Sequence, residues 1–140
     1  MVNFFFEDTN DIDLDREFFV SWLSEVCKNE GNQLNELSLV FCSDKYLLEM
    51  NKKYLNHDYY TDIITFNYSL GEIKGDLFIS VERVAENAEK QGVSFLNELY
   101  RVIVHGTLHL LGHTDKNPKD KSKMTERENA ALDLIVSRET

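Results

Sequence analysis

The central stretch of this chain is Ser94–Asp115, which reads SFLNELYRVIVHGTLHLLGHTD. Apolar residues recur in it at the spacing of an amphipathic helix. The predicted buried stripe consists of Leu96, Leu99, Val102 and Ile103. Ser94 is a candidate N-cap, a role that the nearby Glu98 strengthens. Gly112 predicts the end of the helix, because glycine adopts the left-handed conformation of a helix C-terminus without steric cost. The stretch therefore predicts a buried helix followed by a reversal of the chain.

The histidines of this helix have the spacing of metal ligands. His105 and His109 are four residues apart, and a helix with about 3.6 residues per turn places them on one face. After the turn at Gly112, Asp115 can return to the same ion as a third ligand, through oxygen, and leave a position open for water. Zinc is the first expectation, although manganese, iron, cobalt and nickel bind similar ligand sets. An open position indicates a catalytic site.

His113 is the alternative third ligand. A helix that continued past Gly112 would align His113 with His105 and His109 on one face. We favour Asp115 as the third ligand, because Gly112 breaks that register. His113 is then either a group behind the ligands that donates a proton during catalysis or an exposed loop histidine.

The histidine pair also resembles the zinc protease motif His-Glu-x-x-His. In those proteases the glutamate after the first histidine is the general base, and this chain has Gly106 there. A zinc peptidase is therefore disfavoured. A metal ion would still lower the pKa of a bound water and polarise a phosphoryl oxygen, so hydrolysis remains chemically reasonable.

Several segments together resemble one family. His105–Gly112 looks like the signature of the YbeY family, bacterial metal-dependent endoribonucleases of ribosomal RNA maturation. Asn51–Phe66 is similar to the family's Asn-x-x-Tyr-Arg and Thr-Asp-Val-Leu-Ser-Phe block, and Gly75–Ser80 resembles its Gly-Asp-Ile strand. Glu98 precedes the histidines where the family also carries glutamate. The resemblance covers most of the chain.

The resemblance implies that the protein is a single-strand-specific, metal-dependent endoribonuclease. It would act in 16S rRNA 3′-end maturation and in ribosome quality control. Ribosomal RNA and the ribosome would be its partners, and we expect neither DNA nor a membrane as a partner. The alternative is a ribosome-associated factor whose metal is mainly structural.

Two positions depart from the family pattern. The family motif ends with a third histidine, where this chain has Asp115, an acceptable zinc ligand. The family's arginine after the tyrosine, thought to contact phosphate, is Leu55 here, so a cation that offsets charge on the phosphate is missing. Candidates to replace that cation are His57, Arg83 and Arg101.

Three carboxylates are further candidates for the site. Asp62 can orient a metal-bound histidine or a water molecule through a hydrogen bond, or it can cap the strand that follows it. Asp76 and Glu98 can each accept a proton from an attacking water, and the spacing does not rank them.

Composition favours a single cytoplasmic domain over residues 1–140, with 42% hydrophobic residues and neither a signal peptide nor a membrane-length apolar run. A net charge of −10 argues against a broad nucleic-acid surface, although charge can gather locally. A basic rim, or simply a solvated helix start, is formed by Lys116, Lys119, Lys121, Lys123 and Arg127. Cys27 and Cys42 are predicted to be buried reduced thiols.

The remaining pattern predicts an α+β fold, a mixed four-stranded sheet covered by about five helices. The predicted strands are residues 2–6, 36–42, 63–68 and 73–80, with Gly71 in the turn before the last strand. Besides the histidine helix, we predict a helix that Asp15 or a neighbour caps and that ends near Asn29, a helix over residues 81–91 that Ser80 caps, and a last helix over residues 118–138. A further helix is capped by Ser43 or Asp44 and carries Leu47, Leu48, Met50 and Tyr54 as core residues.

Overall fold

Four strands form one mixed sheet in the order β1-β2-β4-β3 in the computed structural model, which describes residues 1–69 and 72–139. The strands are β1 (Val2–Phe6), β2 (Leu34–Cys42), β3 (Ile63–Asn67) and β4 (Ile73–Ser80). Strands β1, β2 and β4 are parallel, and β3 pairs antiparallel with β4. The predicted strands are confirmed with ends shifted by up to two residues. Gly71 lies outside the described residues.

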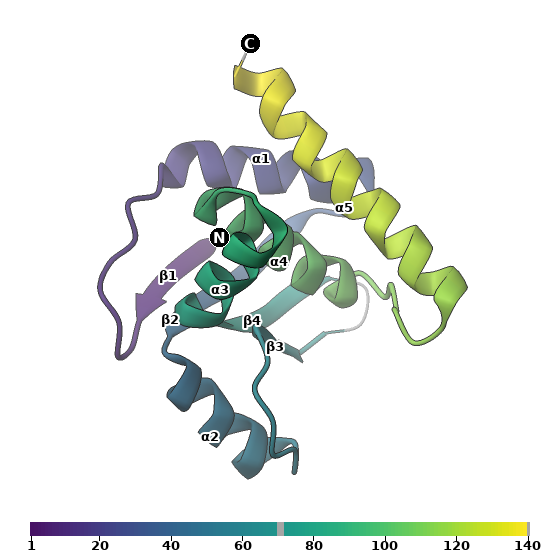
Figure 1. The fold of residues 1–140 in the computed structure, drawn as a ribbon. Helices are drawn as coiled ribbons and strands as arrows, with labels where there is room; N and C mark the ends of the chain where they lie inside the picture. Colours follow the sequence, from purple (N-terminus) through teal and green to yellow (C-terminus); the bar gives the residue numbers. More distant parts are fainter. Residues whose placement is uncertain (70–71, 140) are drawn as a thin grey trace.

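Five helices accompany the sheet in the described part of the chain (Figure 1). They are α1 (Arg16–Asn29), α2 (Asp44–Tyr54), α3 (Val81–Gln91), α4 (Phe95–Leu110) and α5 (Pro118–Glu139). Helices α1 to α4 begin at a side chain that accepts a hydrogen bond from a backbone N–H of the first turn. These N-caps are Asp15, Ser43, Ser80 and Ser94. The α+β class is confirmed.

The two faces of the sheet have separate apolar clusters. On one face, side chains of α1, α3, α4 and α5 share the main core with β4 residues such as Leu77 and Ile79. Trp22 on α1 joins two of these helices, because its indole N–H donates to the Ala131 carbonyl on α5 at 2.7 Å. On the other face, a smaller cluster places Leu47 of α2 against the sheet. Helix α4, with its histidines, therefore belongs to the main core.

Two glycines allow α4 to lie close to the sheet. A Cβ on Gly106 would lie 2.7 Å from Ile63 Cδ1 and 3.1 Å from Leu77 Cδ2. A Cβ on Gly75 would meet the Phe66 carbonyl oxygen and would lie 2.9 Å from a methyl carbon of Leu110. A larger side chain at either glycine would therefore collide with the neighbouring helix or strand.

We expect Gly75→Ala to lower the free energy of unfolding by about 1–3 kcal/mol, the usual cost of overpacking a well-packed interior. The added methyl group meets backbone, which cannot rotate away. Urea unfolding followed by circular dichroism measures the effect. Lys74→Ala is the matched control, because the adjacent side chain is exposed. Equal unfolding midpoints for the two variants would contradict the close packing.

Two predicted core residues are exposed. Leu96 is 37% exposed, and Phe95 beside it packs against the core instead. Tyr54, the last residue of α2, is 58% exposed, although its ring lies edge-on to Phe66 of β3 with the ring centroids 6.3 Å apart. Helical periodicity identified the correct helices, but it did not locate the point at which each helix meets or leaves the core.

The other general predictions concern the thiols and the membrane. Cys27 and Cys42 are free and buried, as predicted, and burial raises the pKa of each thiol to about 12. Within residues 1–69 and 72–139, no helix has the length and apolar character needed to span a membrane.

Candidate metal centre

The turn after α4 reverses the chain at Gly112. Gly112 has φ 95°, and its N–H donates to the His109 carbonyl at 3.0 Å. The N–H of His113 donates to the Leu108 carbonyl, also at 3.0 Å. These two bonds form the Schellman pattern, in which a left-handed glycine closes the end of a helix. The predicted end of the helix is confirmed, and the reversal carries Asp115 back toward the helix.

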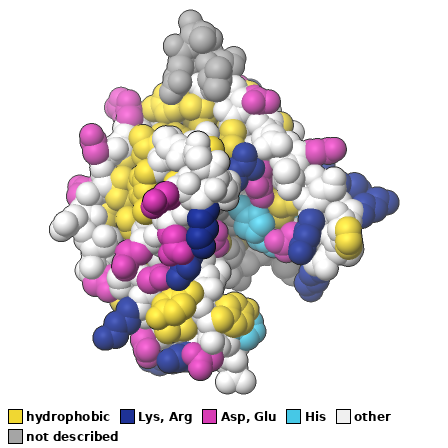
Figure 2. Space-filling model, in the orientation of Figure 1, with side chains coloured by type: hydrophobic (Ala, Val, Ile, Leu, Met, Phe, Trp, Pro, Cys, Tyr) yellow, Lys and Arg dark blue, Asp and Glu magenta, His cyan; other side chains and the backbone are white. Residues whose placement is uncertain are grey.

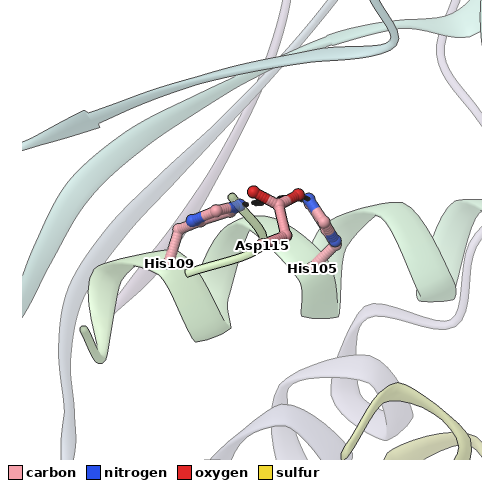
Figure 3. A group of neighbouring side chains, drawn as sticks. All are labelled: His105, His109 and Asp115. Atoms are coloured by element: carbon pink, nitrogen blue, oxygen red, sulfur yellow. Dashed lines mark hydrogen bonds and ion pairs between the residues drawn. The ribbon is translucent and has the colours of Figure 1, made fainter. Parts of the chain in front are cut away.

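Three side chains converge beside this turn (Figure 3). The Nε2 atoms of His105 and His109 are 3.1 Å apart. Asp115 Oδ2 is 3.3 Å from His105 Nε2 and 3.7 Å from His109 Nε2. All three possible ligand atoms lie within 4.8 Å of one another, and each residue is half-buried. Two imidazole nitrogens and one carboxylate oxygen are a donor set that fits zinc or a similar divalent metal.

His113 is not part of this group. Its Nε2 atom lies 3.5 Å from Glu30 Oε2, at the end of α1. Arg127 on α5 also contacts Glu30, with Nη1 2.7 Å from each carboxylate oxygen. The structure therefore brings together His105, His109 and Asp115, and it directs the alternative ligand toward another part of the molecule.

Glu128 on α5 contacts His105 on the ring nitrogen that faces away from the other two side chains. This residue was not predicted from the sequence. Its Oε2 atom lies 2.7 Å from Nδ1 of His105, and Arg101 donates to its Oε1 atom at 3.1 Å. The side chain is buried, with 7% of the residue exposed. The signal in the sequence is the spacing, because Glu128 lies four residues after Met124 and three before Ala131, on the same face of the helix. A charged residue at a buried helical position indicates a specific partner.

The two histidines differ in their electrostatic surroundings. The hydrogen bond with Glu128 raises the pKa of His105 above its usual value, against the opposing effect of burial. Burial and the neighbouring charge of His105 lower the pKa of His109. In the metal-free protein, a proton therefore binds to His105 more readily than to His109.

Zinc affinity should consequently increase as the pH rises through the pKa of His105, which lies above the usual 6.5. Protonated His105 stabilises the metal-free fold at low pH, and this contribution is lost as the pH rises through the raised pKa. Zinc requires the neutral imidazole, so the zinc-induced increase in melting temperature should be larger near pH 8 than near pH 6. Thermal unfolding with and without zinc measures both increases. Equal increases at the two pH values would contradict the proton competition at His105.

The predicted carboxylates lie in different places. Asp62 immediately precedes β3, and burial raises its pKa while the positive charge of nearby His105 lowers it. Glu98 is 3% exposed, and its Oε1 atom has no hydrogen-bond partner among the described residues. Burial raises the pKa of Glu98 as well. Asp76 accepts a hydrogen bond from the Tyr68 hydroxyl at 2.8 Å and lines a groove on the α2 side of the sheet. That position, on the face opposite α4, removes Asp76 from the candidates.

The three cations proposed to replace the family arginine each have a partner. His57 Nδ1 lies 3.0 Å from the Tyr59 hydroxyl. Arg83 donates to Asp44 at 2.6 Å, and Arg101 contacts Glu128 as described above. Because each of these side chains already has a partner within the protein, none of the three is free to bind phosphate without losing that contact.

Lysines near the start of α5 are exposed. They are Lys116, Lys119, Lys121 and Lys123, and none of them forms an ion pair with another residue that the structure describes. Figure 2 shows histidine side chains in a hollow with Lys and Arg side chains on both sides of it. Arg127, the fifth residue of the predicted basic rim, is engaged by Glu30. The described basic rim therefore consists of the four lysines.

Several known proteins are similar to this chain. The family model described as Endoribonuclease YbeY matches residues 5–135. The endoribonuclease YbeY of Cytophaga hutchinsonii is 48% identical over 133 residues, which cover 94% of this chain and 93% of that protein. The endoribonuclease YbeY of Bacteroides thetaiotaomicron is 47% identical over 121 residues, 86% of this chain and 88% of that protein. A solution structure of a Thermotoga maritima protein has the same fold, with a TM-score of 0.71 at 22% identity over 99% of this chain and 91% of that one. This chain belongs to the YbeY family of endoribonucleases.

Proposed function

We propose that this endoribonuclease uses one zinc ion, bound by His105, His109 and Asp115, to cut single-stranded RNA. The observation that carries the proposal is the convergence of these three ligands, within 4.8 Å, in a chain of an endoribonuclease family. We propose ribosomal RNA as the substrate, with 16S rRNA 3′-end maturation and ribosome quality control as the processes. The cytoplasm is then the expected compartment.

The chemistry follows from the donor set and its surroundings. When bound, a zinc ion lowers the pKa of a water ligand and polarises a phosphoryl oxygen. Asp62 and Glu98 are our candidates for the proton acceptor, because a carboxyl group with a raised pKa is better matched to proton transfer near neutral pH. Asp62 is favoured, since it lies close enough to His105 for the two side chains to interact electrostatically. For His113 we propose a minor structural contact with Glu30, in place of proton transfer.

The charge distribution indicates how RNA would bind. With a net charge of −10, the protein as a whole repels phosphate, so we propose that RNA is bound through the exposed lysines near the start of α5. We propose that the ribosome supplies part of the affinity. DNA is not an expected substrate.

The alternatives make different use of the same ion. A ribosome-associated factor with a structural metal is favoured by one observation, Leu55 in place of the family arginine. A zinc peptidase is disfavoured further by the structure, because a side chain at Gly106 would meet Ile63 and Leu77 instead of the metal ligands. The space that the glutamate of the protease motif would need is therefore filled by side chains of the sheet.

The test is a cleavage assay with purified protein on single-stranded ribosomal RNA, the same RNA annealed to its complement, and casein. We expect cleavage of the single strand alone, lost with a chelator and restored by added zinc. Cleavage that persists after zinc has been removed completely would contradict the proposal. Unfolding upon chelation, without any cleavage by the zinc-loaded protein, would support the structural alternative.

A further inference from the structure

We infer that Glu128 is a positioning residue of the metal centre, which fixes the tautomer and ring orientation of His105, and that Arg101 holds the Glu128 carboxylate in place. The inference rests on the proposed metal site. It adds a residue from α5, a separate helix, to a site whose three ligands come from α4 and the turn that follows.

The two nitrogens of the His105 ring have separate partners. Nδ1 lies 2.7 Å from Glu128 Oε2, whereas Nε2 faces His109 and Asp115 at 3.1 Å and 3.3 Å. A carboxylate accepts hydrogen bonds, so in neutral His105 the proton belongs on Nδ1. The lone pair then lies on Nε2, the nitrogen that faces the other two ligand side chains. The hydrogen bond with Glu128 therefore selects the tautomer that can bind a metal through the converging atom.

Arg101 fixes the other side of the carboxylate. Its Nη1 donates to Glu128 Oε1 at 3.1 Å, and its Nη2 donates to Asn129 Oδ1 at 2.9 Å. The two oxygens of Glu128 thus serve two different donors, one on Arg101 and one on His105. A carboxylate with only 7% of its residue exposed is costly to bury unless it is paired in this way.

The Glu128→Gln variant removes one of the two acceptor oxygens that these contacts use, without a change in the size of the side chain. In Glu128→Gln, one carboxylate oxygen becomes an NH₂ group, which donates and cannot accept. Arg101 and the His105 Nδ1–H both need an acceptor, so one of them must face the NH₂ group. Either outcome disturbs the His105 ring, directly or through displacement of the side chain.

We expect Glu128→Gln to weaken zinc binding by about 10- to 100-fold, the usual effect of removing a partner behind a metal-bound histidine. Competition with a chromophoric chelator measures the dissociation constant. Glu126→Gln is the matched control, because it makes the same chemical change at an exposed position of the same helix. Equal zinc affinities of the Glu128→Gln variant and the unsubstituted protein would overturn the inference.

A spectroscopic measurement tests the same point without any variant. In zinc-loaded protein labelled with nitrogen-15, long-range imidazole spectra should show a proton on Nδ1 of His105 and none on Nε2. A proton on Nε2 in that spectrum would overturn the inference, even if Glu128→Gln failed to fold.

Neither readout depends on RNA cleavage. Failure of the RNA assay would contradict the proposed function and leave the zinc affinities and imidazole spectra to decide the role of Glu128. Wild-type zinc affinity in Glu128→Gln, combined with zinc-dependent RNA cleavage, would instead contradict the role of Glu128 alone.

Discussion

Replacing His109 with alanine is expected to lower the rate of RNA cleavage by at least about 100-fold, since even loss of a partner behind a metal ligand costs about 10- to 100-fold. The substitution removes one of three converging ligand atoms and leaves the ion with His105 and Asp115. Zinc content should fall in parallel. Single-turnover cleavage of a labelled single-stranded RNA, with metal analysis of the same preparation, measures both effects.

The control for this experiment is His57→Ala. His57 is exposed in the loop after α2 and contacts Tyr59. It is one of the four histidines, so the control makes the same chemical change outside the proposed site. We expect zinc content to remain unchanged in His57→Ala. Full zinc content and full cleavage in His109→Ala would remove His109 from the metal site.

The second large effect is expected at Asp115. Asp115→Ala should lose zinc and cleavage to about the same extent as His109→Ala, because it removes the only oxygen ligand of the proposed set. His113→Ala should keep its zinc, with cleavage within about 2- to 3-fold of normal, as for a substitution that costs about 0.5 kcal/mol. The physical reason is that His113 Nε2 faces Glu30, 3.5 Å away.

The pair of variants discriminates between the two possible third ligands. Both residues lie in the turn after α4 and are partly exposed, so we expect only small differences in folding. Thermal unfolding of the metal-free variants checks this. The opposite result, with zinc lost in His113→Ala and retained in Asp115→Ala, would show that the turn rearranges when metal binds.

The turn at Gly112 shows what could be predicted from the sequence. The spacing of His105 and His109 and the glycine three residues later are local features, and local geometry determines their outcome. The helix caps at Asp15, Ser80 and Ser94 were predictable for the same reason. In each case the interacting groups are separated by only a few residues along the chain.

Glu128 shows what could not be predicted with the same ease. It lies 23 residues beyond His105, and its contact depends on how α5 crosses α4. In the sequence it directly follows Arg127, in a segment of mixed charge that resembles part of a solvated helix. The burial of Met124 and Ala131 on the same face becomes visible only when the helices are packed together.

The cation for phosphate shows a similar limit. Arg83 and Arg101 were reasonable substitutes for the family arginine by charge alone. Their partners, Asp44 and Glu128, lie 39 and 27 residues away along the chain. Because residue spacing carries no information on such pairing, the sequence did not distinguish engaged arginines from the exposed lysines of α5.

Anomalous diffraction at the zinc absorption edge, from crystals of the zinc-loaded protein, would locate the metal ion. We expect a single strong peak between His105 Nε2, His109 Nε2 and a carboxylate oxygen of Asp115, with His113 remaining at Glu30. A peak bound by His113 in place of Asp115, or a peak away from both histidines of α4, would contradict the proposed metal site.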